Sequence, residues 1–152
     1  MAIDPAVIGK PLPVIKAEIE PGRLQQFAAA IGETDPIYTD RSAARAAGHP
    51  DLPVPPTFLF GLTLQGPDSF GFMADLGIDL RHVLHGEQGF TYHSVAHAGD
   101  TLVLRPVITD VYAKKNGQLE FVVRETAVTR DDGSAVADLK EVLIVRHRPA
   151  DG

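Results

Sequence analysis

Apolar and polar residues follow two different periods along the chain, and the period changes near residue 80. Before that point the apolar residues recur at helical spacing. Within residues 20–32, one helical face collects four of them: Leu24, Phe27, Ala28 and Ile31. Pro21 stands where a first-turn proline is favoured, and Gly32 stands where helices commonly end. The pattern therefore predicts a helix over residues 20–32.

A second, shorter helix is predicted directly downstream. Asp40 has the side chain of a good N-cap, and residues 41–47 are mostly alanine and arginine, which favour helix. Gly48 suits the position after a helix, and Pro50 cannot continue one. We expect this helix to begin at Asp40 and to end at Gly48.

From residue 83 onward the pattern is extended. Four runs are rich in β-branched and aromatic residues, as strands are: residues 83–95, 101–113, 118–130 and 135–147. Tight-turn signals at Asn116-Gly117 and at residues 131–134 join neighbouring runs. The last three runs are therefore expected to form an antiparallel meander.

Residues 55–65 are apolar on nearly every face, so both a strand and a buried helix fit them. Pro55 and Pro56 at the start favour the helix. A helical first half that contains such a segment, followed by long antiparallel strands, predicts an α+β fold. In that fold a curved sheet wraps around the apolar helix.

Size and composition fit one folded domain. The chain has 152 residues, of which 44% are hydrophobic and 22% charged. We expect one domain over residues 1–148 and a loose tail over residues 149–152. A net charge of −6 without any basic run argues against a nucleic-acid partner. Neither a secretion signal nor an unbroken membrane-spanning stretch is evident, so we expect a cytoplasmic protein with no membrane partner.

The histidines do not predict a metal site. Four of them lie within sixteen residues: His82, His85, His93 and His97. On a continuous strand, however, His85 and His93 would stand roughly 26 Å apart at ~3.3 Å per residue. The chain also has no cysteine, which excludes disulfides, thiolate metal sites and cysteine nucleophiles. We expect no metal.

The stretch "FAAAIGETDPIYTDRSAA", residues 27–44, resembles the hydratase signature of the MaoC-like, (R)-specific enoyl-CoA hydratase family. Four positions match as they stand: Gly32, Pro36, Ile37 and Ala44. Three positions depart from the signature. The catalytic Asp of the family corresponds to Glu33, its Asn to Asp35, and its catalytic His to Tyr38.

Two further segments, residues 43–58 and 83–102, resemble the FAS1-type dehydratase region typified by the HadA subunit of mycobacterial fatty-acid dehydratases. The resemblance implies a hot-dog fold, in which an antiparallel sheet grips a long central helix. It also implies pairing into a dimer or a double hot dog. The implied substrates are acyl thioesters of CoA or of a carrier protein, and the implied chemistry needs no metal or redox cofactor.

Hydration of an enoyl thioester needs a base for water, an acid for the α-carbon and donors for the thioester carbonyl. Glu33 and Tyr38 keep the spacing of the catalytic pair of the family. A phenol with a pKa near 10 is a poor base at neutral pH, but it can orient water or donate a hydrogen bond. Asp35 is a third candidate, and its alternative is a plain cap on turn amides.

Three other positions are candidates for the same site. His85 is the best substitute for a missing base, and Gly86 beside it would let a ligand approach the backbone. The alternative for His85 is a strand histidine held by a neighbouring carbonyl. The first amides of the apolar helix, at Thr57 and Phe58, would suit a thioester oxygen, unless they only cap the helix. Residues 66–80 are polar and glycine-rich, and a flap over an acyl chain is one interpretation.

Two functions from different classes fit these residues. One is an acyl-thioester hydratase or dehydratase; the other is a non-catalytic, HadA-like acyl-binding subunit, which the substitution at Tyr38 favours. In the second case the partner would be another MaoC-like chain that carries the Asp and His. Both a homodimer and such a heterodimer are therefore expected assemblies. A hot-dog thioesterase is a third possibility, against which the hydratase-like loop argues.

Overall fold

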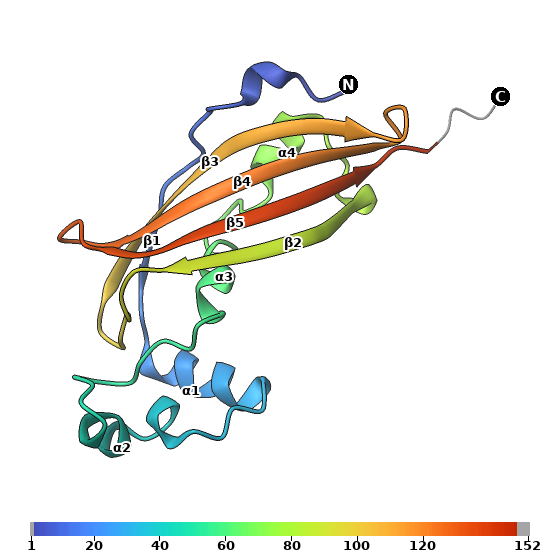
Figure 1. Cartoon of the computed structure of the whole chain (residues 1–152). Helices are drawn as coiled ribbons and strands as arrows, with labels where there is room; N and C mark the ends of the chain where they lie inside the picture. Colours follow the sequence, from blue (N-terminus) through green and yellow to red (C-terminus); the bar gives the residue numbers. More distant parts are fainter. Residues whose placement is uncertain (1, 149–152) are drawn as a thin grey trace.

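The computed structural model describes residues 2–148, and within them the chain forms one five-stranded antiparallel sheet with helices beside it (Figure 1). The strand order is β1-β3-β4-β5-β2. The strands are β1 (Ile15–Glu18), β2 (Val83–Tyr92), β3 (Thr101–Lys114), β4 (Leu119–Arg130) and β5 (Ala135–Arg146). The α+β fold and the four predicted strands are confirmed. The tail over residues 149–152 lies outside the described residues.

β1 was not predicted from the sequence. Its four residues alternate, with Ile15 partly buried, Ala17 buried, and Lys16 and Glu18 exposed, but the run is only four residues long. It pairs with the start of β3, where Ala17 faces Leu102. A strand this short depends on its partner, because four residues give only a weak periodic signal.

β3, β4 and β5 form the predicted meander. In the first turn Asn116 and Gly117 both have positive φ, at 53° and 82°, the backbone that tight hairpin turns require. Gly133 has a φ of 86° in the second turn. The turn chemistry therefore fixes the pairing of neighbours, as we expected.

The helices are α1 (Pro21–Ala30), α2 (Arg41–Ala46), α3 (Phe58–Leu62) and α4 (Gly71–Asp75), with three 3-10 turns at η1 (Pro5–Val7), η2 (Pro36–Tyr38) and η3 (Leu80–His82). Figure 1 shows α1 and α2 at the end of the sheet away from both termini. The predicted first two helices and the helical state of the apolar segment are confirmed. Within residues 2–148 no helix has the length and apolarity needed to cross a membrane.

The long central helix implied by the family resemblance is wrong for this chain. α3 stops after five residues, and the hydroxyl of Thr63 turns back to the carbonyl of Phe60 at 2.7 Å. Gly66 then has a φ of 119°, which lies outside the helical region, and Pro67 follows it. A glycine in this conformation followed by a proline breaks the helix before α4 can continue it.

Two apolar clusters hold the helices on one face of the sheet. The first joins α1, α2 and α3 to the sheet, and its members include Leu24, Ala44, Leu59, Leu104 and Leu139. The second joins α4 to the sheet and includes Phe72, Met73, Ile108, Val122 and Leu143. Phe72, Met73 and Ile78 are buried, so these residues anchor the segment around α4 to the sheet.

Candidate functional site

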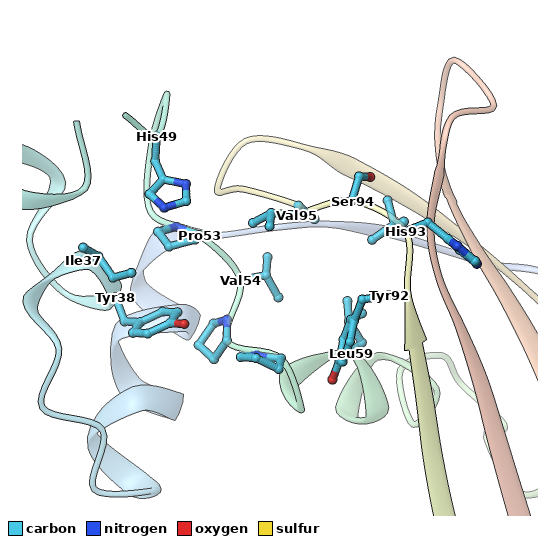
Figure 2. A pocket seen from close by; sticks show the side chains of 14 residues that line it. Ile37, Tyr38, His49, Pro53, Val54, Leu59, Tyr92, His93, Ser94 and Val95 are labelled. Atoms are coloured by element: carbon cyan, nitrogen blue, oxygen red, sulfur yellow. The ribbon is translucent and has the colours of Figure 1, made fainter. Parts of the chain in front are cut away.

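A cavity of about 330 Å³ opens where the loop after α1 meets the start of α3 (Figure 2). η2 contributes Ile37 and Tyr38, and residues 53–56 lead from the wall into α3, which contributes Leu59. Residues 92–96 close the cavity from the end of β2. The two places that the family resemblance selected thus share one apolar-walled hollow.

Tyr38 is placed by a capped 3-10 turn. The Asp35 carboxylate accepts a hydrogen bond from the Ile37 amide at 3.1 Å, so Asp35 is the N-cap of η2. Glu33 in turn accepts from the Asp35 amide at 2.9 Å. Asp35 therefore caps turn amides, as its alternative interpretation predicted. Neither the Glu33 nor the Asp35 carboxylate is among the residues that line the cavity.

The environment of Tyr38 keeps its phenol protonated. Partial burial raises the pKa of Tyr38, and the negative charges of Glu33 and Asp35 raise it further. Each of these effects disfavours the phenolate. At neutral pH Tyr38 is therefore a hydrogen-bond donor and not a general base.

Of the two amides predicted to be free for a thioester oxygen at the start of α3, one is already paired. The Phe58 amide donates to the carbonyl of Pro55 at 3.0 Å, so the prediction that it is unpaired is wrong. The Phe58 ring is buried against Phe27, with ring centroids 5.4 Å apart. Within residues 2–148 no acceptor pairs with the Thr57 amide, and Thr57 directly follows Pro56 of the cavity wall.

The structure does not bring His85 to this cavity. Its Nε2 lies 3.1 Å from the Gln88 side-chain oxygen and 3.7 Å from Glu141, which is itself paired with buried Arg124. Tyr92, which does line the cavity, stands seven residues further along the same strand, roughly 23 Å away at ~3.3 Å per residue. His85 and Tyr38 are therefore parts of different environments.

Gly86 is required by packing against β5. A β-bulge separates His85 from Glu87 in the register with β5. A Cβ atom on Gly86 would stand 2.8 Å from the Cδ1 atom of Ile144 and 3.1 Å from the Val142 carbonyl. The space beside this glycine is thus occupied by β5 and not by a ligand.

His49 lines the cavity, and sequence reasoning did not single it out. It follows α2 in a Schellman motif: Gly48 has a φ of 95°, and the His49 amide donates to the Ala44 carbonyl at 3.0 Å. Its Nδ1 lies 2.9 Å from the Nε2 of His97. The Gly-His-Pro sequence after the helix was the one local signal that could have pointed to His49. Its contact with His97, however, joins residues 48 positions apart in the chain.

His97 is held in place by its own backbone and by the loop after it. Its amide donates to the Asp100 carboxylate at 2.9 Å, and it forms an isolated β-bridge with Pro53 of the cavity wall. Burial lowers the pKa of His97, and the charge of His49 lowers it further. The neutral imidazole is therefore the favoured state of His97 near pH 7.

His93 is directed elsewhere. Its Nε2 lies 2.8 Å from the Asp138 carboxylate, and Figure 2 shows its ring turned away from Tyr38 and His49. Across residues 2–148, no three histidine, aspartate or glutamate side chains converge as metal ligands would.

A second hollow, of about 720 Å³, lies between residues 10–16, the segment from Thr63 to Asp75, and Arg124. None of the seven predicted site residues lines it. The smaller cavity is therefore the candidate site.

Known proteins resemble this chain in sequence and in fold. A UPF0336 protein of Saccharopolyspora erythraea is 33% identical over 147 residues, which cover 96% of this chain and 93% of the relative. The truncated HadBC (3R-hydroxyacyl-ACP dehydratase) complex of Mycobacterium tuberculosis superposes with a TM-score of 0.78 at 23% identity, covering 95% of this chain and 99% of that one.

The (R)-hydratase of A. caviae involved in PHA biosynthesis superposes with a TM-score of 0.64 at 15% identity, covering 90% of this chain and 94% of that one. These neighbours confirm the hot-dog fold. The model of the FAS1-like, dehydratase domain region matches residues 6–139. The chain therefore belongs to the FAS1-like dehydratase domain region family.

Proposed function

We propose that this chain is a hydratase or dehydratase of acyl thioesters, acting on an enoyl-CoA or an enoyl-carrier protein. The observation that carries the proposal is the cavity that Tyr38 shares with the segment leading into α3. An apolar wall with few polar groups suits an acyl chain next to a reacting thioester. The dehydratase and hydratase activities named for the HadBC complex and the A. caviae protein support the same reaction class.

Tyr38, which lines the cavity, and three residues close to it in sequence or next to the cavity wall divide the chemistry as follows. The Tyr38 phenol is protonated, so it donates a hydrogen bond to the reacting water or to the thioester carbonyl. The Thr57 amide beside Pro56 is the second donor for that carbonyl. Glu33 and Asp35 contribute their negative charge, which keeps the phenol protonated.

A second candidate function is an acyl-binding subunit whose site is completed by a MaoC-like partner chain. β2 supports it, because this ten-residue strand lies at the edge of the sheet with Leu84 47% and Tyr92 48% exposed. A long exposed edge strand is a template for pairing with another chain. Since Tyr92 also lines the cavity, a chain paired along β2 would stand next to the site.

The test uses the purified chain, alone and mixed with a MaoC-like chain that retains the Asp and His of the signature. Hydration of crotonyl-CoA and of a longer enoyl-CoA is measured, and thiol release is followed in parallel to detect a thioesterase. Activity of the single chain supports the enzyme, and activity that appears on mixing supports the subunit. Hydration by neither sample, or thiol release without hydration, contradicts the proposed reaction.

A further inference from the structure

The titratable side chains that line the cavity in residues 2–148 are Tyr38, His49, Tyr92 and His93. Burial raises the pKa of both phenols, so neither exchanges a proton readily near pH 7. The His93 ring is engaged by Asp138 outside the cavity. Among these four residues, the His49 imidazole is therefore the remaining candidate for proton transfer.

The geometry of His49 leaves one nitrogen for a ligand. Its Nδ1 is engaged with Nε2 of His97 at 2.9 Å. Among the described residues no hydrogen bond engages its Nε2, and Figure 2 places its ring on the same side of the cavity as Tyr38, with Tyr92 and Leu59 across from both. A ring held through one nitrogen presents the other in a fixed direction.

The charges around the pair determine which ring carries a proton. Asp51, which pairs with Arg41, and Asp100 raise the pKa of His97, whereas Arg130 lowers it, as do burial and His49. The net shift is downward, so His97 stays neutral and its Nε2 can accept the Nδ1 proton of His49. A neutral acceptor behind Nδ1 stabilises a positive charge on His49.

We propose that His49 is the proton-exchanging residue of this cavity and that His97 is its positioning residue. This inference rests on the proposed function. In hydration, the water oxygen bonds to C3 while His49 Nε2 takes one water proton, and the C2=C3 electron pair moves towards the thioester carbonyl. The proton then passes from Nε2 to C2. The sum adds one water to the double bond and returns His49 to its neutral state; dehydration is the reverse.

The kinetic test compares His49→Gln, His97→Leu, His97→Gln and the control His82→Gln in whichever assembly hydrates enoyl-CoA. His82 lies in η3, is exposed and does not line the cavity. His49→Gln is expected to lower kcat by about 10²-fold or more, because general acid–base catalysis contributes on that scale. His97→Leu removes the acceptor behind Nδ1, so kcat is expected to fall with KM little changed, and His97→Gln, whose side-chain oxygen can accept the same hydrogen bond, is expected to restore part of it. His82→Gln is expected to retain kcat.

Full hydration activity in His49→Gln overturns the inference and leaves the proposed function standing. Activity of His97→Gln no higher than that of His97→Leu overturns the positioning by His97, because a merely structural loss would not be rescued by restoring the acceptor.

A second readout does not depend on turnover. The ring nitrogens of 15N-labelled protein are followed by NMR while an unreactive acyl-CoA thioether is added. The His49 signals are expected to shift, and the signals of His82, which lies in η3 outside the cavity lining, to stay. Unchanged His49 signals in a sample that binds the thioether elsewhere overturn the inference, even if no enoyl thioester is turned over.

Discussion

Tyr38 and His49 are the two cavity residues whose chemistry differs most, and their surroundings explain the difference. Partial burial raises the pKa of the Tyr38 phenol, and two carboxylates on the turn before it raise that pKa further. Among the hydrogen bonds of residues 2–148, the His49 ring is engaged by His97 and not by a carboxylate. The first is thereby suited to donate a hydrogen bond and the second to exchange a proton.

Tyr38→Phe removes the hydroxyl while the ring stays. Because one preorganised donor is lost, kcat/KM for enoyl-CoA hydration is expected to fall by about 10²-fold. The free energy of unfolding, measured by urea titration, is expected to change by less than about 1 kcal/mol because the apolar ring is kept. Tyr112→Phe is the matched control, because Tyr112 lies outside the cavity, where its ring stacks on that of Phe121. Equal activity of the two variants would contradict the assignment of Tyr38.

His97 also predicts how stability depends on pH. Its folded pKa is lowered, so the unfolded chain takes up a proton near the ordinary value of about 6.5 while the folded chain resists it. The free energy of unfolding is therefore expected to fall as pH drops through about 6.5 towards the folded pKa. His97→Leu is expected to flatten this dependence relative to His82→Gln, a substitution at an exposed position in η3. An unchanged slope in denaturant titrations would contradict the lowered pKa.

At the scale of elements, local signals predicted most of the fold. α1 and α2 were predicted because proline, glycine and capping residues bound them, and β2–β5 because they are rich in β-branched and aromatic residues. β1 was missed because it is only four residues long, and the length of α3 was set by Thr63 and Gly66 downstream.

The site was less predictable than the fold. The predicted Tyr38 lines the cavity because a capped local turn places it there. The contact of His49 with His97 spans 48 residues, and the position of His85 away from the cavity depends on sheet register. Neither has a signal within a short window of sequence.

Gly48 connects the end of α2 to the cavity. An alanine there meets no atom within 4 Å, but the φ of 95° is strained for an L-residue. Gly48→Ala is therefore expected to cost about 1–2 kcal/mol of unfolding free energy and to lower kcat by moving His49. Gly22→Ala, in α1 with equally open space and no positive φ, is the control and is expected to be neutral or stabilising. Equal stability of the two variants would rule out the strained turn.

At the scale of the whole molecule, the exposed edge of β2 implies a second chain. Neighbours of this fold include a heteromeric dehydratase complex. Arg130 holds the loop after β2 through Ser94 and the Val95 carbonyl, so this edge and the cavity wall form one connected surface. Assembly and catalysis are therefore expected to depend on the same region.

Leu84→Lys places a charge on this edge strand. Light scattering of the wild-type chain alone is expected to give twice the 16.3 kDa mass of the monomer. With a partner chain present, it is expected to give the mass of a one-to-one complex. The Leu84→Lys variant is expected to dissociate at a higher protein concentration than the wild type does. Ala127→Lys, an exposed position on the central strand β4, is the charge-matched control. Equal masses for both variants at every concentration would place the interface elsewhere.

A crystal structure of the active assembly with an unreactive enoyl-CoA analogue tests the central claim most directly. The thioester carbonyl is predicted to lie within hydrogen-bond distance of the Tyr38 hydroxyl, with C3 facing His49 Nε2. An analogue bound in the hollow beside residues 10–16, with the cavity of Tyr38 and His49 empty, would contradict the account.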